Sequence, residues 1–241
     1  MARTNYSAYL AIKRKILDIF RTEKFPNNKL PPESKLAQRL GISLVTLREA
    51  LLMLALEGYI TKQHGSGNYI HPSALDYENR SYYFADCLKR EGFETTLEVL
   101  DQTYIPADER QASFLKLGPG DKLLRSRILY RADGKPAILT IGHIPAANLI
   151  RDDVEKMDFQ QVHVLLEDFC GKDLAHSLNE YMPLGLPEGL EPLFELPAGS
   201  PIICMEQVFY STHDEPVLYN LHYVYPNRYK IRTLQNWALG N

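Results

Sequence analysis

The chain has 241 residues, 45% hydrophobic and 24% charged, which is the composition of an ordinary soluble globular protein and enough for two modest domains or one large one. It contains no window of about 18 uninterrupted apolar residues and no N-terminal apolar run of signal-peptide length, so we expect neither a membrane span nor a secretory leader. The net charge of −3 conceals an asymmetry, because residues 1–75 contain 11 Lys and Arg against 5 Asp and Glu, whereas residues 76–241 contain 16 against 25. This split predicts that only the first region approaches a polyanion, although charge alone is weak evidence.

The three cysteines are Cys87, Cys170 and Cys204, which are widely spaced and show neither metal-ligand spacing nor a CxxC pair. An odd number of isolated cysteines is typical of reduced thiols in an intracellular protein. We therefore expect a cytoplasmic protein that needs no disulfide, metal or cofactor.

Helical periodicity begins near the N-terminus. Residues 6–21 place apolar side chains at helical spacing with three basic residues between them, and residues 26–28 (PNN) end this predicted helix. A second helix is predicted after Pro31-Pro32, where Glu33 suits the positive end of the helix dipole, and Gly41 permits the tight turn that ends it.

The stretch SLVTLREA, residues 43–50, opens a third predicted helix. Ser43 is placed to cap its N-terminus, and Ala37 and Gly41 supply the small contact and the turn that a helix-turn-helix needs. Thr46 and Arg48 then project from the first turn, as in a recognition helix presented to the DNA major groove. The apolar wedge between the two helices consists of Leu36, Leu40, Ile42, Leu47 and Ala50.

A short hairpin is predicted next, with strands at residues 59–63 and 68–70 around Gly65-Ser66-Gly67. Lys62, Gln63 and His64 put hydrogen-bond donors at its edge, as a wing that follows DNA phosphates requires. The alternative is a helical hairpin followed by an ordinary β-hairpin with no role in DNA binding.

Residues 10–70 resemble the winged helix-turn-helix of the GntR family of bacterial transcription regulators, most clearly over LPPESKLAQRLGISLVTLREALLMLALEGYITKQHGSGNYI. The resemblance implies DNA contacts at the start of the second and third helices and at the wing tip. The implied DNA-binding residues are Ser34, Lys35, Ser43, Leu44, Thr46, Arg48, His64 and Gly65. Family members usually carry Arg at the position of Leu44 and often at that of Ser34, so we expect an operator different from the usual one, with Leu44 as a candidate contact for thymine methyl groups.

The remaining chain reads as a polar linker to about residue 80, a short helix at 82–92, and six strand-like segments separated by helices at 107–117 and 157–171. Residues 123–144 align with residues 203–224, matching Tyr130 with Tyr210 and Pro136 with Pro216. Two related hairpins predict a mainly antiparallel sheet with approximate twofold symmetry, although any two hairpins share some likeness.

The motifs YRADGKPAILTIGHIP and DEPVLYNLHYVYPNRYKI resemble the UTRA effector domain, which follows the helix-turn-helix in the HutC subfamily and has the chorismate-lyase fold. The resemblance implies an α+β protein with a DNA-binding domain at 1–71, a linker at 72–81, and an effector-binding and dimerisation domain at 82–241. Sugar-phosphate-sensing members carry Arg and Glu where this chain has Ile128, Tyr130 and Leu218, which favours a more apolar or aromatic effector. Candidate effector residues are Arg125, Arg127 (if the register slips by one), Tyr130, His143, His176, Leu218, Asn220 and His222.

We therefore expect a homodimeric transcriptional repressor that binds palindromic double-stranded operator DNA and is released by a small metabolite, with no membrane partner. An enzyme is the alternative from another class, since the implied fold is that of a lyase, but no nucleophile–base pair, phosphate loop or paired carboxylates support it. A metal site at the three strand histidines is not expected, because lone histidines on strands are more often structural. An activator, or a DNA-binding protein without an effector, stays open.

Overall fold

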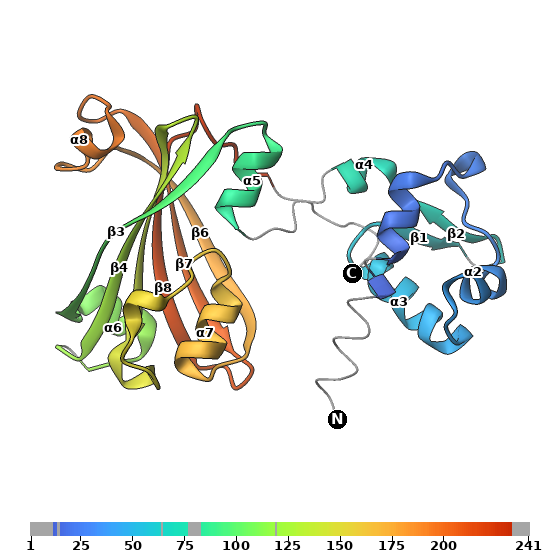
Figure 1. The fold of residues 1–241 in the computed structure, drawn as a ribbon, viewed down its shortest axis with the longest axis horizontal. Coiled ribbons are helices and arrows are strands. Elements are labelled where there is room, and N and C mark those ends of the chain that lie inside the picture. Colours follow the sequence, from blue (N-terminus) through green and yellow to red (C-terminus); the bar gives the residue numbers. More distant parts are fainter. Residues whose placement is uncertain (1–11, 14, 64, 77–82, 119, 233–241) are drawn as a thin grey trace. The chain divides into compact units, whose positions relative to one another are not determined.

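A computed structural model of the chain describes residues 12, 13, 15–63, 65–76, 83–118 and 120–232. The chain forms two compact units, one of residues 1–80 and 232–241 and one of residues 81–231, and each is described by itself (Figure 1). No helix in the described ranges is long and apolar enough to cross a membrane.

The first unit is a helical core with a two-stranded hairpin. A helix at residues 15–22 precedes the short turn η1 (Pro26–Asn28), α2 (Glu33–Leu40) and α3 (Leu44–Leu56). The hairpin strands β1 (Ile60–Gln63) and β2 (Gly67–Ile70) are antiparallel and lie within one residue of the predicted wing. The winged helix-turn-helix arrangement is therefore confirmed.

The turn between α2 and α3 forms for the predicted reasons. Gly41 adopts a left-handed conformation with φ of 66°, and its N–H bonds to carbonyls of the last turn of α2. Leu36, Ala37, Leu47 and Ala50 are all buried, so the two helices share one apolar core.

The expected linker begins later than residue 72. Residues Pro72–Asp76 form the short helix α4, and Ala74 is buried in the core of the first unit. Proline at the first helical position explains the helix, because its fixed φ is already helical and its missing N–H would have no partner there.

The second unit is a six-stranded antiparallel sheet in the order β3-β4-β5-β8-β7-β6. The strands are β3 (Thr95–Pro106), β4 (Lys122–Ala132), β5 (Lys135–Pro145), β6 (Leu174–Gly185), β7 (Pro201–Ser211) and β8 (Pro216–Val224). The helices are α5 (Phe84–Arg90), α6 (Glu109–Leu115), α7 (Val162–Cys170) and α8 (Glu191–Phe194), with the short turns η2 (Ala146–Asn148) and η3 (Val154–Lys156). All six predicted strands are present, whereas α8 was not predicted from the sequence.

The strand order has the approximate twofold symmetry that the internal repeat predicts, since β3-β4-β5 mirrors β6-β7-β8. The predicted residue match needs one correction. A bulge in each hairpin pairs Arg131 with Pro136 and Tyr210 with Pro216, so Arg131 rather than Tyr130 occupies the position of Tyr210. The reason is that the second hairpin turn contains one more residue than the first.

Helices cover both faces of this sheet (Figure 1). Residues of α5 and α7 pack with Ile128, Tyr130 and Leu218, which point to one face. Residues of α6 and α8 pack with Leu123 and Leu129, which point to the other face. We call these the α5/α7 face and the α6/α8 face, and strand alternation assigns every other strand residue to one of them.

Candidate DNA interface and candidate ligand face

The head of α3 is capped as predicted. The Ser43 hydroxyl accepts a hydrogen bond from the Thr46 backbone N–H at 3.1 Å, and the two hydroxyls lie 2.7 Å apart. A serine cap of this kind stabilises a helix by about 1 kcal/mol. It also fixes which residues of the first turn face outward.

Arg48 is tied to the start of α2. Its Nε donates to a carboxylate oxygen of Glu33 at 2.8 Å, and the Asn68 amide on β2 donates to the other oxygen at 3.2 Å. The hydrogen bond from Arg48 lowers the pKa of the Glu33 carboxyl. Glu33 thus joins α2, α3 and the wing, a role that the sequence analysis did not find because the contacts to Glu33 span 15 and 35 residues.

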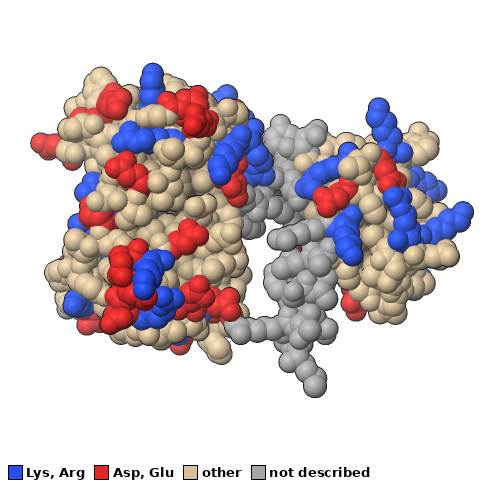
Figure 2. Space-filling view, viewed as in Figure 1, with Lys and Arg blue, Asp and Glu red and all other residues tan. Residues whose placement is uncertain are grey.

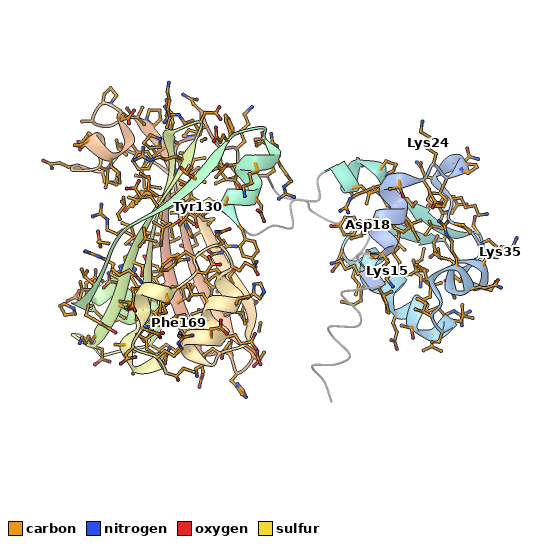
Figure 3. The ribbon with its side chains drawn as sticks, viewed as in Figure 1. Lys15, Asp18, Lys24, Lys35, Tyr130 and Phe169 are labelled. Carbon is orange, nitrogen blue, oxygen red and sulfur yellow. The ribbon has the colours of Figure 1, made fainter. Side chains whose placement is uncertain are left out.

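The expected contact residues at the helix starts differ in exposure. Ser34, Lys35, Ser43 and Arg48 are exposed, whereas Thr46 is half-buried. Lys35 projects outward from α2 (Figure 3).

The apolar pair at the head of α3 is arranged differently from the expectation. Leu44 is half-buried and packs against the core, whereas the next residue, Val45, is 65% exposed. Val45 was not among the candidates, because only the cap at Ser43 and the packing of the helix decide which of two adjacent apolar residues turns outward.

The wing tip brings two backbones close together. Gly65 is exposed with φ of 71°, and Gly67 has φ of 120°, where an added Cβ would lie 3.4 Å from Cε of Lys29. Lys29 also forms a bridge with Tyr69, so the segment before α2 flanks the wing. His64, the remaining predicted tip residue, lies outside the described residues.

Some Lys and Arg side chains of the first unit form ion pairs, and others do not within the described ranges. Arg39 pairs with Glu23, and Lys13 pairs with Glu57 at 2.9 Å. Other cations have no ion-pair partner within the described ranges, and Figure 2 shows Lys and Arg prominent on the visible surface of this unit. These cations are Lys15, Lys24, Lys29, Lys35 and Lys62.

The candidate effector residues do not form one cluster, because the sheet separates them. Tyr130, Leu218, Asn220 and His222 lie on the α5/α7 face. Arg125, Arg127, His143 and His176 lie on the α6/α8 face. Part of this division could be predicted from the sequence. Side chains alternate between the two faces along a strand, and Arg125 and Arg127 are each an odd number of residues from Tyr130 on the same strand.

The candidates on the α6/α8 face are engaged with one another and with neighbours. Asp101 accepts from Arg125 at 3.2 Å and from Arg127 at 3.1 Å. His143 lies 3.2 Å from the Gln111 amide, and burial lowers its pKa to about 4. His176 stacks on Tyr210 with ring centres 4.9 Å apart.

The α5/α7 face contains a continuous row of uncharged residues across all six strands, which we call the central polar row. Consecutive members face one another in the strand registers, so the row runs straight across the sheet. Its members are Gln102, Ser126, Gly142, Asn220, Gln207 and Asn179. Apolar clusters under α5 and α7 flank the row on either side.

Two buried polar groups on this face lack hydrogen bonds. Asn220 is 7% exposed and Tyr130 is 6% exposed, yet neither the amide nor the hydroxyl bonds to any described residue. Gly142 makes room for the amide, because an added Cβ would lie 2.9 Å from Oδ1 of Asn220. The two side chains are largely buried but their polar atoms are not fully enclosed, so both groups are accessible to a ligand.

His222 is a buried, neutral side chain beside the central polar row, and both of its ring nitrogens are hydrogen-bonded. Thr140 Oγ1 lies 2.9 Å from its Nδ1, and Gln207 Oε1 lies 3.2 Å from its Nε2. Burial lowers the pKa of His222 to about 3. The imidazole is therefore uncharged at neutral pH, with Nε2 donating to Gln207.

Aromatic side chains cover this region from the α5 side. The Phe84 ring lies 4.9 Å from His222 and 5.6 Å from Tyr130, measured between ring centres. Tyr83, which precedes α5, hydrogen-bonds to Nδ1 of His163 on α7. Figure 3 shows Tyr130 near α5 and Phe169 on α7.

No cluster of three or more His, Cys, Asp or Glu side chains in the described part of the chain could hold a metal ion. The three strand histidines are also separated, since His222 lies on one face of the sheet and His143 and His176 on the other. The arrangement suits binding rather than catalysis, because the buried groups on the α5/α7 face are neutral hydrogen-bonding groups.

Comparisons with known proteins agree with both units. Residues 7–70 match the model of bacterial regulatory proteins of the gntR family, and residues 90–230 match the UTRA domain. The uncharacterized HTH-type transcriptional regulator YurK of Bacillus subtilis (strain 168) is 23% identical over 91% of this chain and 92% of its own. The histidine utilization repressor of Pseudomonas putida is 27% identical over 56% of this chain and 54% of its own.

Among solved structures, the possible transcriptional regulator YydK from Bacillus subtilis superposes with a TM-score of 0.72 at 19% identity, over 95% of this chain and 99% of that one. This likeness confirms the fold in both parts. The chain therefore belongs to the gntR family of bacterial transcriptional regulators, among the HutC-like members whose second domain is a UTRA effector domain.

Proposed function

We propose that this regulator is a repressor that binds palindromic operator DNA as a homodimer and leaves it when a small molecule binds the second unit. The observation that carries the proposal is the capped head of α3, tied through Arg48 and Glu33 to α2 and through Asn68 to the wing. A recognition helix held in this way meets the major groove in a fixed orientation.

The DNA contact rests on exposed residues of three elements. Ser34 and Lys35 at the start of α2, the first turn of α3, and Gly65 at the wing tip are the proposed contacts. The cations without ion-pair partners supply contacts to phosphates, which give affinity without sequence preference. Side chains at the head of α3 contact the base edges and so give sequence preference.

Two copies are proposed to associate through the second unit. Its edge strands carry large exposed apolar side chains, namely Val99 and Tyr104 on β3 and Leu178 and Tyr181 on β6. Exposed apolar residues on an edge strand favour association with another chain. Twofold pairing would present two recognition helices to half-sites about one helical turn apart.

Release is proposed to begin at the α5/α7 face. A ligand on the central polar row would contact α5 and α7 through Phe84 and the Tyr83–His163 contact. Helix α5 begins at Phe84, a few residues after the chain passes from the first unit to the second, so a shift of α5 is a short route to the DNA-binding unit. The ligand needs only to bind the arrangement with low DNA affinity more tightly.

The test is selection of operators from random DNA, followed by sedimentation of the complex. We expect an inverted repeat and two chains per duplex. Arg48→Ala should weaken binding, because it removes a contact and releases Glu33. An asymmetric site, or one chain per duplex at saturation, would contradict the dimeric mode.

A further inference from the structure

We propose that the effector is an uncharged molecule with hydrogen-bonding groups, such as a neutral sugar, polyol or amide, and that Asn220 and Tyr130 anchor it on the α5/α7 face. This inference rests on the proposed effector-controlled function and names the chemical class of its ligand.

Charge is distributed unevenly over the two faces of the sheet. Between the strand ends, no described strand residue that points to the α5/α7 face is charged at neutral pH, and the charged residues within the strands point to the opposite face. Those charged residues are Glu98, Asp101, Arg125, Arg127, Arg131, Glu180 and Glu206. An anionic ligand here would lose its hydration without meeting a cation, which is costly.

The α5/α7 face offers both hydrogen-bond donors and hydrogen-bond acceptors without charge. The Asn220 amide both donates and accepts, and the Tyr130 hydroxyl does the same. Both side chains are more than nine-tenths buried and lack protein partners in the described ranges. A hydroxyl or amide of a ligand satisfies them, as an apolar ligand does not.

The neighbours of Asn220 and Tyr130 also favour an uncharged ligand. His222 stays neutral, because burial holds its pKa far below its usual range and its two nitrogens are engaged by Thr140 and Gln207. The carboxylate of exposed Asp158 adds to burial in raising the pKa of Tyr130. A negative group near Tyr130 disfavours an anionic ligand further.

The side chains on and beside the row also suit a small molecule. Ser126 and Gly142 bring no large side chain to the row, and Phe84 and Tyr130 meet edge to face with ring centres 5.6 Å apart. A small molecule with an apolar side toward these rings and polar groups toward the row fits both surfaces.

The experiment uses the full chain, its selected operator and a bacterial metabolite extract. Anion- and cation-exchange resins divide the extract into anionic, cationic and neutral fractions, and each is tested for release of fluorescent operator DNA. We expect release by the neutral fraction. Release by only the anionic or only the cationic fraction would overturn the inference while leaving the effector-controlled function intact, and release by none would contradict both.

Matched variants identify the anchors. Asn220→Ala should raise the amount of neutral fraction needed for release at least tenfold, and Tyr130→Phe, which removes only the hydroxyl, should raise it several-fold. Arg125→Gln and Arg127→Gln, on the opposite face of the sheet, are the controls and should respond as wild type. DNA affinity without extract should be unchanged in every variant that folds. A wild-type response in Tyr130→Phe and Asn220→Ala would overturn the anchoring role.

Discussion

The polar side chains at the head of α3 are largely engaged within the protein. Ser43 caps the helix with Thr46, and Arg48 binds Glu33 through Nε, which leaves Val45 as the exposed apolar side chain of the first turn. Thymine is the only base that presents a methyl group in the major groove. We therefore expect Val45 to contribute to reading thymine.

Val45→Ala should weaken operator binding by roughly four- to fifteenfold with little change in Tm, because it removes two methyl groups and each one buried against DNA contributes about 0.8 kcal/mol, or roughly fourfold in affinity. Replacing the contacted thymine by uracil removes the methyl from the other side and should have a similar effect. When both changes are made together, the loss of affinity should be smaller than the product of the two separate losses. The measurement is the affinity of wild-type protein and of Val45→Ala for the thymine DNA and for the uracil DNA. If the loss from Val45→Ala and the loss from the uracil replacement multiply at every thymine of the operator, Val45 does not contact a thymine methyl group.

The buried neutral histidines predict acid sensitivity of the second unit. The folded pKa of His222 is about 3, below the unfolded value near 6.5, so the unfolded chain binds more protons between these values. The stabilising effect is therefore complete above the unfolded pKa and is lost as pH falls toward 3, by about 1.4 kcal/mol per pH unit for each such group.

Urea unfolding of the full chain at pH 7, 6 and 5, followed by circular dichroism, should show this loss in the transition of the second unit. His222→Gln should reduce the pH slope of that transition, leaving the contribution of His143, whose pKa is about 4. An unchanged slope in the variant would mean that His222 is not held neutral by burial.

At the scale of elements, the wing depends on a backbone that only glycine adopts easily. Gly67 has φ of 120° and Lys29 close to the position of an added Cβ, whereas Gly65 has φ of 71° and open space around it. Gly67→Ala should therefore destabilise the first unit by roughly 1–3 kcal/mol.

The matched control is Gly65→Asn, since asparagine tolerates the left-handed conformation. Thermal unfolding should separate the two, with a lower Tm for Gly67→Ala and a much smaller change for Gly65→Asn. Equal losses would show that the backbone conformation of Gly67 does not set the stability of the wing.

Elements were more predictable from the sequence than contacts between them. Proline, glycine and the Ser43 cap marked the ends of α2 and α3 through local chemistry, and β-branched runs marked the strands. The central polar row joins six strands and depends on their registers, including bulges near Asp101 and Arg131, so spacing along the chain could not reveal it. The placement of Arg125 and Arg127 on the opposite face from Tyr130 could have been predicted, because side chains alternate between faces along one strand.

At the scale of the whole molecule, charge separates the roles of the two units. Residues 1–75 have a surplus of Lys and Arg and residues 76–241 a surplus of Asp and Glu, so contacts with phosphates belong to the first unit. The second unit keeps its strand charges off the α5/α7 face, which leaves that face for an uncharged ligand. DNA affinity should therefore be steeply salt-dependent, whereas effector affinity should hardly change with salt.

The most direct measurement is fluorescence anisotropy of the full chain with labelled DNA from its own promoter, compared with scrambled DNA, across a salt series. The account predicts tight binding to the promoter DNA, at least a thousandfold preference over the scrambled sequence, and a steep loss of affinity as salt rises. Weak binding with equal affinity for both DNAs would contradict the claim that the head of α3 and the wing read an operator.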